Sequence, residues 1–383
     1  MGLEGARLIP SIFILHCYEV EYGRFNSKSL DCMLELRHRG IINYVCTMIK
    51  TTLEVLKAGC GDCIFITIKY NKKSFHILID GGVSATYLDF KCGYPKSGEL
   101  KNKIECLKNA NEHIDLLVIT HIDDDHIGGI INWFSHDFPD KSFVKEVWFN
   151  DNVAIPQFQS TNDSKETAID LKTLLDKQGI PYKNKIVQNQ QYRYDWGKIC
   201  ILSPNAKYHN KVAKILQETL DRRTTDNSGN DSYLKSIDDL MICKWKSQLS
   251  DANKASIAFL LSTCDDHNYL MLGDTAINVL ISGLKNLGYG KNHKLECETI
   301  KLSHHGSKNN YKDKFLDFVS TKQFVVSTDG TSYGHPDKEV IAHLITKTNS
   351  DILFNYDDVL KRLFTKEDLA SYPQILQRCK MCQ

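Results

Sequence analysis

The chain has 383 residues, of which 42% are hydrophobic and 25% are charged, as is typical of a soluble globular protein with a large buried core. Its 48 basic and 47 acidic residues leave a net charge of +1, which argues against a protein whose main activity is tight binding to a nucleic-acid backbone. No segment approaches the roughly 20 apolar residues that a membrane-spanning helix needs, so the sequence predicts no contact with a membrane.

The 13 cysteines are scattered along the chain instead of being spaced as a disulfide framework. Two C-x-x-C pairs, Cys60/Cys63 and Cys379/Cys382, lie at opposite ends of the chain, whereas a structural zinc site usually needs both pairs within one small module. We interpret the cysteines as buried reduced thiols. Together with the lack of a targeting signal, they predict a cytoplasmic protein.

A recognisable domain begins at Met48. Residues 1–47 show short apolar patches with no sustained period, and we interpret them as an N-terminal extension that is disordered or is not translated. Residues 48–383 are expected to form the domain. Its first predicted strands span residues 51–56, 63–68 and 75–79, and the last of these ends in Asp80-Gly81-Gly82.

Strands and helices alternate through the rest of the domain. Helix 163–178 has the clearest boundaries, because Asp163 can cap its start and Gly179 followed by Pro181 ends it. Residues 204–254 are polar and irregular, and we interpret them as a long surface insertion. The other predicted helices span 99–110, 277–286, 312–318 and 338–346, and the other predicted strands span 114–120, 143–149, 256–261, 269–272, 299–303 and 324–327. This order fits two sheets packed face to face with helices outside, although it fits a mixed three-layer sheet equally well.

The most informative segment is an apolar strand that runs directly into titratable side chains. These side chains are His121, Asp123, Asp124, Asp125 and His126. Left unpaired at a buried strand end they would be costly, and a bound cation resolves the problem, since imidazole and carboxylate are ligands of zinc, manganese and iron. Asp125 and His126 project in different directions, which suits two metals. Gly128-Gly129 is expected to let the backbone turn tightly into the next helix. The competing interpretation is a solvated acidic loop.

Three further segments place histidine or aspartate after predicted strands. They are Gly273-Asp274, His304-His305-Gly306-Ser307 and Tyr333-Gly334-His335-Pro336. Each has an ordinary interpretation by itself, since Asp274 could cap a helix, the two histidines could be a surface pair, and His335 could pack in a turn. Ligand sites gather at strand ends, however, so the segments together predict one metal site.

This series of motifs resembles the metallo-β-lactamase superfamily, and within it the soluble hydrolase domain of ComEC-like proteins. The matching segments, in order, are Gly59–Asp62, Asp80, His121–Gly129, Gly273-Asp274, His304–Ser307 and Tyr333–Pro336. The resemblance extends from about Met48 to about Thr346 and implies a four-layer αββα sandwich of the α/β (α+β) class. It is specific for the fold and the metal site, and much less specific for the substrate.

The resemblance also implies a site for two divalent metal ions, zinc or manganese. The first ion would be bound by His121 and Asp123, and the second by Asp125, His126 and one of His304 and His305, of which His305 is favoured; Asp274 would bridge both ions. Asp80 would orient a ligand histidine through its other ring nitrogen. Asp123 stands where the commonest motif of the superfamily has a second histidine, and no histidine between His126 and Asp274 fits the third motif. The resulting site is rich in carboxylates, which favours manganese.

A hydroxide between two metals roughly 3.5–4 Å apart suits attack on a phosphodiester. The first hypothesis is therefore a phosphodiesterase or nuclease that acts on a small-molecule or nucleic-acid substrate. Asp125, His304 and His335 are the candidate catalytic residues, with His335 donating a proton to the leaving oxygen or contacting the phosphate, and His304 contacting substrate or metal. The alternatives are hydrolysis of a lactone or thioester, and a binding or regulatory module without catalysis. The sequence leaves the oligomeric state unknown.

Overall fold

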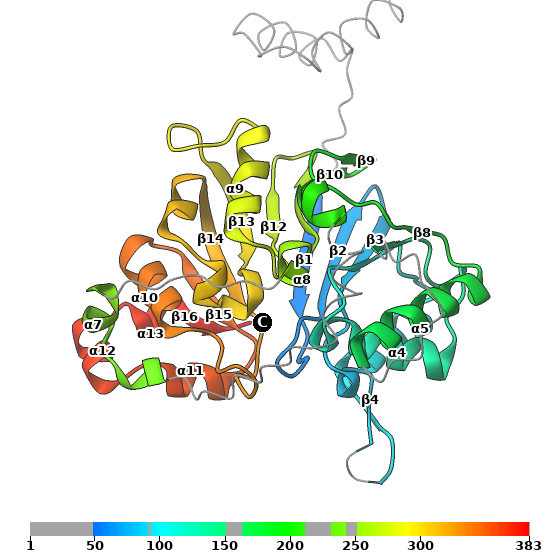
Figure 1. The fold of residues 1–383 in the computed structure, drawn as a ribbon, viewed down its shortest axis with the longest axis horizontal. Coiled ribbons are helices and arrows are strands. Elements are labelled where there is room, and N and C mark those ends of the chain that lie inside the picture. Colours follow the sequence, from blue (N-terminus) through cyan, green and yellow to red (C-terminus); the bar gives the residue numbers. More distant parts are fainter. Residues whose placement is uncertain (1–48, 91–92, 151–162, 211–230, 243–250, 383) are drawn as a thin grey trace, which may run out of the picture. The chain divides into compact units, whose positions relative to one another are not determined.

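The computed structural model describes residues 49–90, 93–150, 163–210, 231–242 and 251–382 (Figure 1). The predicted extension at 1–47 lies outside these ranges. A six-stranded sheet has the order β1 (Lys50–Val55), β2 (Ile64–Tyr70), β3 (Lys73–Ile79), β6 (Leu116–Ile119), β7 (Val147–Phe149) and β8 (Tyr182–Lys183). An eight-stranded sheet has the order β16 (Cys379–Met381), β15 (Asp351–Phe354), β14 (Val319–Val326), β13 (Leu295–Lys301), β12 (Asn268–Met271), β11 (Ala258–Thr263), β10 (Gly197–Ser203) and β9 (Gln191–Tyr194). A two-stranded hairpin comprises β4 (Leu88–Asp89) and β5 (Lys96–Ser97).

The strand residues alternate between two apolar environments, and this alternation determines how the sheets pack. Ile64, Ile66 and Ile68 of β2 lie in the core between the sheets, while Phe65 lies in the core on the opposite face. In the second sheet Cys200 points away from the core that its neighbours Ile199 and Ile201 enter. Side chains alternate in this way because successive residues of a strand point to opposite faces. Both sheets are therefore apolar on both faces and need a covering layer outside.

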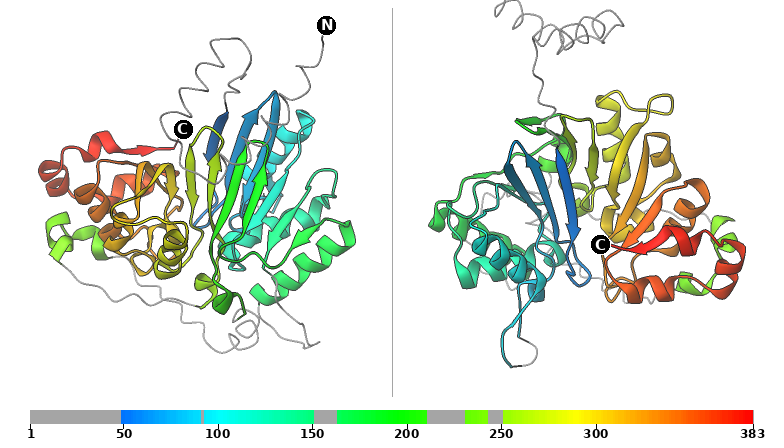
Figure 2. Two further views of the ribbon diagram at one scale, coloured as in Figure 1. Left: turned by 90° about the horizontal axis from the view of Figure 1, so that it is seen from above. Right: turned by 180° about the vertical axis from the view of Figure 1, so that it is seen from behind.

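Helices provide these outer layers (Figures 1 and 2). The outer face of the first sheet packs against α3 (Glu99–Asn109), α4 (Asp124–Asp137) and α5 (Asp163–Gln178). The outer face of the second sheet packs against α9 (Ile277–Asn286), α10 (Lys338–Lys347), α11 (Asp357–Leu363) and α13 (Ile375–Arg378). The remaining described helix at the C-terminal side is α12 (Lys366–Ser371). The two sheets and two helical layers confirm the predicted four-layer αββα sandwich.

Several predicted boundaries differ from the structure. Residues 312–318 form a 3₁₀ helix at Asp313–Asp317 instead of an α-helix, and the strand predicted at 143–149 is restricted to Val147–Phe149. No elements were predicted for residues 182–203 or after residue 346, where the structure has β8 to β10 and then β15 to β16 with three helices. Two of these strands, β8 and β15, are only two and four residues long, so their sequences carry little periodic pattern.

The Gly128-Gly129 pair does not form the predicted turn before a helix but lies inside α4, which already begins at Asp124. A Cβ at Gly129 would lie 2.0 Å from the carbonyl oxygen of Gly81, and a Cβ at Gly128 would lie 2.9 Å from the amide nitrogen of Ser84. The glycines are needed because the helix crosses directly over the backbone that follows β3. That close crossing brings the start of α4 next to Asp80.

The predicted insertion at 204–254 is described for residues 204–210, 231–242 and 251–254. It contains the short helices α7 (Ile237–Ile242) and α8 (Asp251–Lys254). Ile237 is buried in the core outside the second sheet and Met241 packs against that core, so α7 packs on the domain. Among the described helices, none combines the length and the apolar character needed to cross a bilayer. The cysteines in the described ranges are free.

Candidate metal centre

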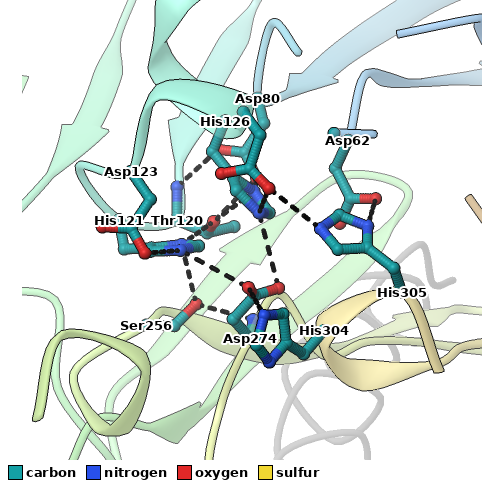
Figure 3. A network of polar contacts seen from close by, with 12 residues as sticks. Asp62, Asp80, Thr120, His121, Asp123, His126, Ser256, Asp274, His304 and His305 are labelled. Atoms are coloured by element: carbon teal, nitrogen blue, oxygen red, sulfur yellow. Dashed lines mark hydrogen bonds and ion pairs between the residues drawn. The ribbon is translucent and has the colours of Figure 1, made fainter. Parts of the chain in front are cut away.

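The predicted ligands come together where strands of the two sheets end (Figure 3). In the first sheet β6 ends at Ile119 and α4 begins at Asp124, so His121 and Asp123 lie in the connection while Asp125 and His126 lie in the first turn of α4. In the second sheet Asp274 follows β12, and His304 follows β13, which is parallel to β12. Because parallel neighbours place their carboxyl ends at the same sheet edge, Asp274 and the histidine pair are brought side by side.

Two of the imidazoles are held by groups that accept a hydrogen bond at Nδ1. His126 Nδ1 lies 2.8 Å from Asp80 Oδ2, and His305 Nδ1 lies 2.7 Å from the carbonyl oxygen of Ser327. Asp80 is itself fixed, since it accepts from the amide and the hydroxyl of Thr120, each at 2.7 Å. A carbonyl or carboxylate oxygen accepts only, so Nδ1 carries the hydrogen and Nε2 keeps its lone pair. The structure thus places Asp80 at Nδ1 of His126, which is one of the expected ligand histidines.

The other two imidazoles are oriented in the same way. His304 Nδ1 lies 2.8 Å from Oδ1 of Asn310, whose amide nitrogen donates to the carbonyl of Asp274 at 2.8 Å, so Oδ1 is the accepting end. His121 Nδ1 lies 3.0 Å from the hydroxyl oxygen of Thr120, whose hydrogen is donated to Asp80. When it is neutral, each of the four imidazoles therefore presents an Nε2 lone pair to the same space.

Carboxylates occupy the other side of that space. Asp274 Oδ2 lies 3.6 Å from Nε2 of His121 and 3.6 Å from Nε2 of His304, while its Oδ1 lies 3.5 Å from Nε2 of His126. Asp125 Oδ2 lies 3.3 Å from Nε2 of His305. Lone pairs that face one another repel, so this arrangement needs either protons or cations between its members.

Several buried nitrogen and oxygen atoms of the cluster lack hydrogen-bond partners, as expected for metal ligands. Nε2 of His121, His126 and His305 and Oδ1 of Asp274 are buried and have no hydrogen-bond partner in the described part of the chain. Two sets of ligand atoms lie within 4.8 Å of one another, namely His121/His126/Asp274 and Asp125/His126/His305. These are the donors that zinc and manganese accept, at a spacing that a cation can bridge. The residues present therefore fit a metal centre.

The structure brings every predicted ligand to this cluster. Asp123 is more exposed than the others, and its Oδ2 lies 3.4 Å from Nε2 of His121. The sequence left open which of His304 and His305 is the ligand, and both direct Nε2 into the cluster, at different carboxylates. Both have left-handed backbone conformations, with φ of 48° and 55°. This conformation costs about 1–2 kcal/mol for each residue that has a side chain, so the local structure is strained where the two rings converge.

The electrostatics of the metal-free site differ between the two neighbouring histidines. Burial lowers the pKa of His305, but the carboxylates of Asp62 and Asp125 outweigh burial and raise the pKa to about 9. At His304 burial dominates and lowers the pKa to about 4. Burial also opposes ionisation of Asp274, yet the surrounding imidazoles hold the pKa of this carboxyl well below its usual range. A cation that binds here must therefore displace protons.

His335 lies at the rim of the cluster. Its ring centroid is 5.0 Å from that of His304, and its Nδ1 lies 3.5 Å from Oδ2 of Asp337. Asp337 also accepts a hydrogen bond from the amide of Lys308 at 2.9 Å. Tyr333 is 60% exposed, and its ring stacks near that of His335, with centroids 6.2 Å apart.

Sequence reasoning gave no role to three residues that the structure places around the site. Asp62 lies 3.3 Å from Nδ1 of His305 and forms a buried ion pair with Lys301. Asp337 lies beside His335. Asp62 could have been suspected, because it ends the Gly59–Asp62 motif and directly precedes a buried strand. Lys301 carries no such signal, since it is a lone lysine at the end of an apolar strand.

No protein-family model matches this chain, and no curated protein matches it. Among solved structures it is similar to a possible metal-dependent hydrolase from Veillonella parvula, with 11% identity over 88% of this chain and 97% of that chain and a TM-score of 0.39. It is also similar to a diphosphatase from the PhnP family (11% identity, 87% and 95% covered, TM-score 0.36) and to an isothiocyanate hydrolase from Delia radicum gut bacteria (11%, 87% and 96%, 0.36). Similarities with TM-scores this low carry no information about activity. The assignment of the fold is based on the observed sheet topology.

Proposed function

We propose that this protein is a metal-dependent hydrolase that cleaves phosphodiester bonds at a site for two divalent cations. The observation that supports this most directly is the position of Asp274, whose two carboxylate oxygens face the Nε2 atoms of different imidazoles, those of His121 and His126. All of these atoms are hydrogen-bond acceptors when the imidazoles are neutral. Two cations held by His121, His126 and Asp274 would give each of these acceptor atoms a partner.

The distances also suggest how the ligands divide. His304 joins the first cation position in this proposal, because its Nε2 converges with that of His121 on the same oxygen of Asp274. The first set is His121, Asp123, Asp274 and His304, and the second set is Asp125, His126, His305 and Asp274. His304 then fills the role for which the sequence offers no histidine between His126 and Asp274. The many carboxylates favour manganese over zinc.

Two bound divalent cations supply a water that is nucleophilic at neutral pH and stabilise the negative charge that develops on a phosphate. The protein holds the donor atoms in place for this chemistry through the Nδ1 contacts to Asp80, Ser327 and Asn310. Donors fixed in advance need no reorganisation when substrate arrives.

The leaving oxygen of a phosphodiester needs a proton, and in this proposal His335 provides it. Asp337 lies at Nδ1 of His335 and is itself held by the backbone of Lys308. This leaves Nε2 as the ring atom that can face a substrate. Asp337 thus acts as a positioning residue for the proposed proton donor.

The order of the matching motifs supports a relationship to the ComEC-like hydrolases of the metallo-β-lactamase superfamily. A net charge of +1 gives no basic excess to follow a long duplex, so we favour a small or single-stranded phosphodiester as substrate. Free cysteines throughout the described ranges support a cytoplasmic location.

Hydrolysis of bis-p-nitrophenyl phosphate tests the proposal. Purified protein with added Mn²⁺ is expected to turn over this substrate, and Asp274→Ala is expected to abolish turnover while remaining folded. Wild-type protein that binds Mn²⁺ but does not hydrolyse the ester would redirect the search to lactones and thioesters. Protein that binds neither Mn²⁺ nor Zn²⁺ would favour a non-catalytic binding module.

Substrates with different leaving groups test the role of His335. p-Nitrophenolate leaves readily without a proton, whereas an alkoxide such as a nucleoside hydroxyl does not. His335→Ala is therefore expected to slow cleavage of a dinucleotide by about 10²–10⁴-fold and to affect the p-nitrophenyl ester much less. Equal losses on both substrates would exclude His335 as the proton donor.

A further inference from the structure

A buried ion pair joins the two sheets directly behind the second proposed cation position. Asp62 precedes β2 of the first sheet, and Lys301 is the last residue of β13 in the second sheet. Both side chains are almost completely buried, and the ammonium group of Lys301 contacts Oδ2 of Asp62. Two ions in the protein interior lose most of their hydration, so their presence needs a reason beyond stability.

The second oxygen of Asp62 indicates that reason. Oδ1 has no hydrogen-bond partner among the described residues and lies 3.3 Å from Nδ1 of His305. The hydrogen of this Nδ1 is directed to the carbonyl of Ser327 at 2.7 Å, so Asp62 acts on the ring mainly through its charge. A negative charge beside the ring increases the electron donation of Nε2 to a cation.

The backbone of the same loop holds the neighbouring ligand. The amide of Asp62 donates to the carbonyl oxygen of Asp125 at 3.1 Å, and the hydroxyl of Ser327 donates to the carbonyl of Gly61 at 3.1 Å. Asp62 therefore contacts both His305 and Asp125, whose side chains face each other across 3.3 Å. The pair has no comparable contact with His121, Asp123 or His304 in the described residues.

Asp62 does not form a further cation site of its own. Its carboxylate lies within 4.8 Å of Asp80 and His126, which makes a third cluster of possible ligand atoms. Lys301 already neutralises Asp62, however, and Asp80 accepts three hydrogen bonds from His126 and Thr120. A cation would have to displace these partners.

From this geometry we propose that Asp62 and Lys301 are positioning residues for His305, and that they set the affinity of the second cation position selectively. Asp62 supplies the negative charge beside the imidazole of His305. The ammonium group of Lys301 compensates this charge in the protein interior. The inference rests on the proposed two-cation site. It predicts that loss of the pair weakens one cation position and leaves the other unchanged.

A second buried lysine–aspartate pair in this chain provides a matched control. Lys338 and Asp368 are equally buried and lie on α10 and α12, where they contact each other and nearby backbone groups. Asp368 accepts hydrogen bonds from the amides of Ile237 and Thr365, and Lys338 donates to the carbonyl of Lys235 at 2.6 Å. This pair therefore connects backbone segments and has no metal ligand beside it.

The test compares two double variants of the full chain, Asp62→Asn/Lys301→Met and Asp368→Asn/Lys338→Met. Each removes both charges at nearly constant volume, so neither leaves a lone buried ion. Binding of Mn²⁺ is measured by isothermal titration calorimetry, and folding is checked by thermal unfolding without metal. We expect the first variant to bind one Mn²⁺ about 10–100-fold more weakly and the other normally, and the control variant to bind both normally.

Four outcomes would overturn the inference. They are unchanged affinities in the folded Asp62/Lys301 variant, equal weakening of both positions, equal weakening in the control variant, and failure of both the double variant and Asp62→Asn to fold while the control folds. If the double variant alone fails to fold, Mn²⁺ binding is measured for the single Asp62→Asn variant and judged by the same criteria. Wild-type protein that binds no Mn²⁺ would instead refute the proposed site itself, so the two failures are distinguishable.

Discussion

Replacement of Gly61 by alanine is expected to displace the proposed metal ligand Asp125 without changing any of the proposed ligand side chains. A Cβ at Gly61 would lie 1.7 Å from the carbonyl oxygen of Asp125. The next amide, that of Asp62, donates to this same oxygen at 3.1 Å, so the two segments are already bonded together. Ordinary contact begins at 3.4 Å, and the two backbones would therefore have to separate by about 1.7 Å.

This displacement is large compared with the tolerance of the site. Metal–ligand distances are typically kept within about 0.2 Å, so Asp125 could not keep its position in the second ligand set. Crowding in a packed interior typically costs about 1–3 kcal/mol, and misplacing a reacting group by about 1 Å can reduce a rate about 10²-fold. We expect Gly61→Ala to lower the free energy of unfolding by about 1–3 kcal/mol and to slow Mn²⁺-dependent hydrolysis about 100-fold.

The assay combines urea unfolding of the chelator-treated protein with hydrolysis of bis-p-nitrophenyl phosphate at saturating Mn²⁺. Gly290→Ala is the control, because a Cβ at Gly290 meets no atom within 4 Å and the residue does not need a left-handed backbone. The control is expected to match the wild type in both measurements. If Gly61→Ala also matched it, the close approach of the two backbones could not be what positions Asp125.

Three further predictions concern other parts of the molecule. Asp80→Asn removes the charge behind His126 and is expected to weaken Mn²⁺ binding about 10–100-fold in a calorimetric titration; unchanged binding would contradict the role of Asp80. Lys338→Met leaves Asp368 buried without its partner and is expected to cost about 3–5 kcal/mol in urea unfolding, with hydrolysis unaffected at temperatures where the protein stays folded. Burial lowers the pKa of His76 below its ordinary 6.5, so the unfolded chain takes up a proton there first and stability falls as pH drops through 6.5. His76→Phe is expected to reduce this fall in unfolding free energy between pH 7 and pH 5, and an identical pH dependence in both proteins would count against it.

Local sequence patterns predicted the elements that are long and strongly periodic. Helix 163–178 was predicted with its observed boundaries, because local signals such as Gly179, which has a φ of 62°, mark its end. The start of α4 was predicted incorrectly, since Gly128 and Gly129 suggest a turn when only local preference is considered. Their purpose is the close contact with the backbone after β3, and that contact joins residues nearly 50 positions apart.

The sequence by itself determined the chemistry that is available to this protein. Histidine and aspartate residues that follow strands are the candidate metal ligands. Their side chains can meet because neighbouring parallel strands end at the same edge of a sheet, whatever path the connections take. Only the tertiary structure decided which donor faces which. It directed His304 to Asp274 and His305 to Asp125, and it placed the Asp62–Lys301 pair beside His305. These choices depend on side-chain directions and on burial between two sheets, and no local pattern in the chain encodes either.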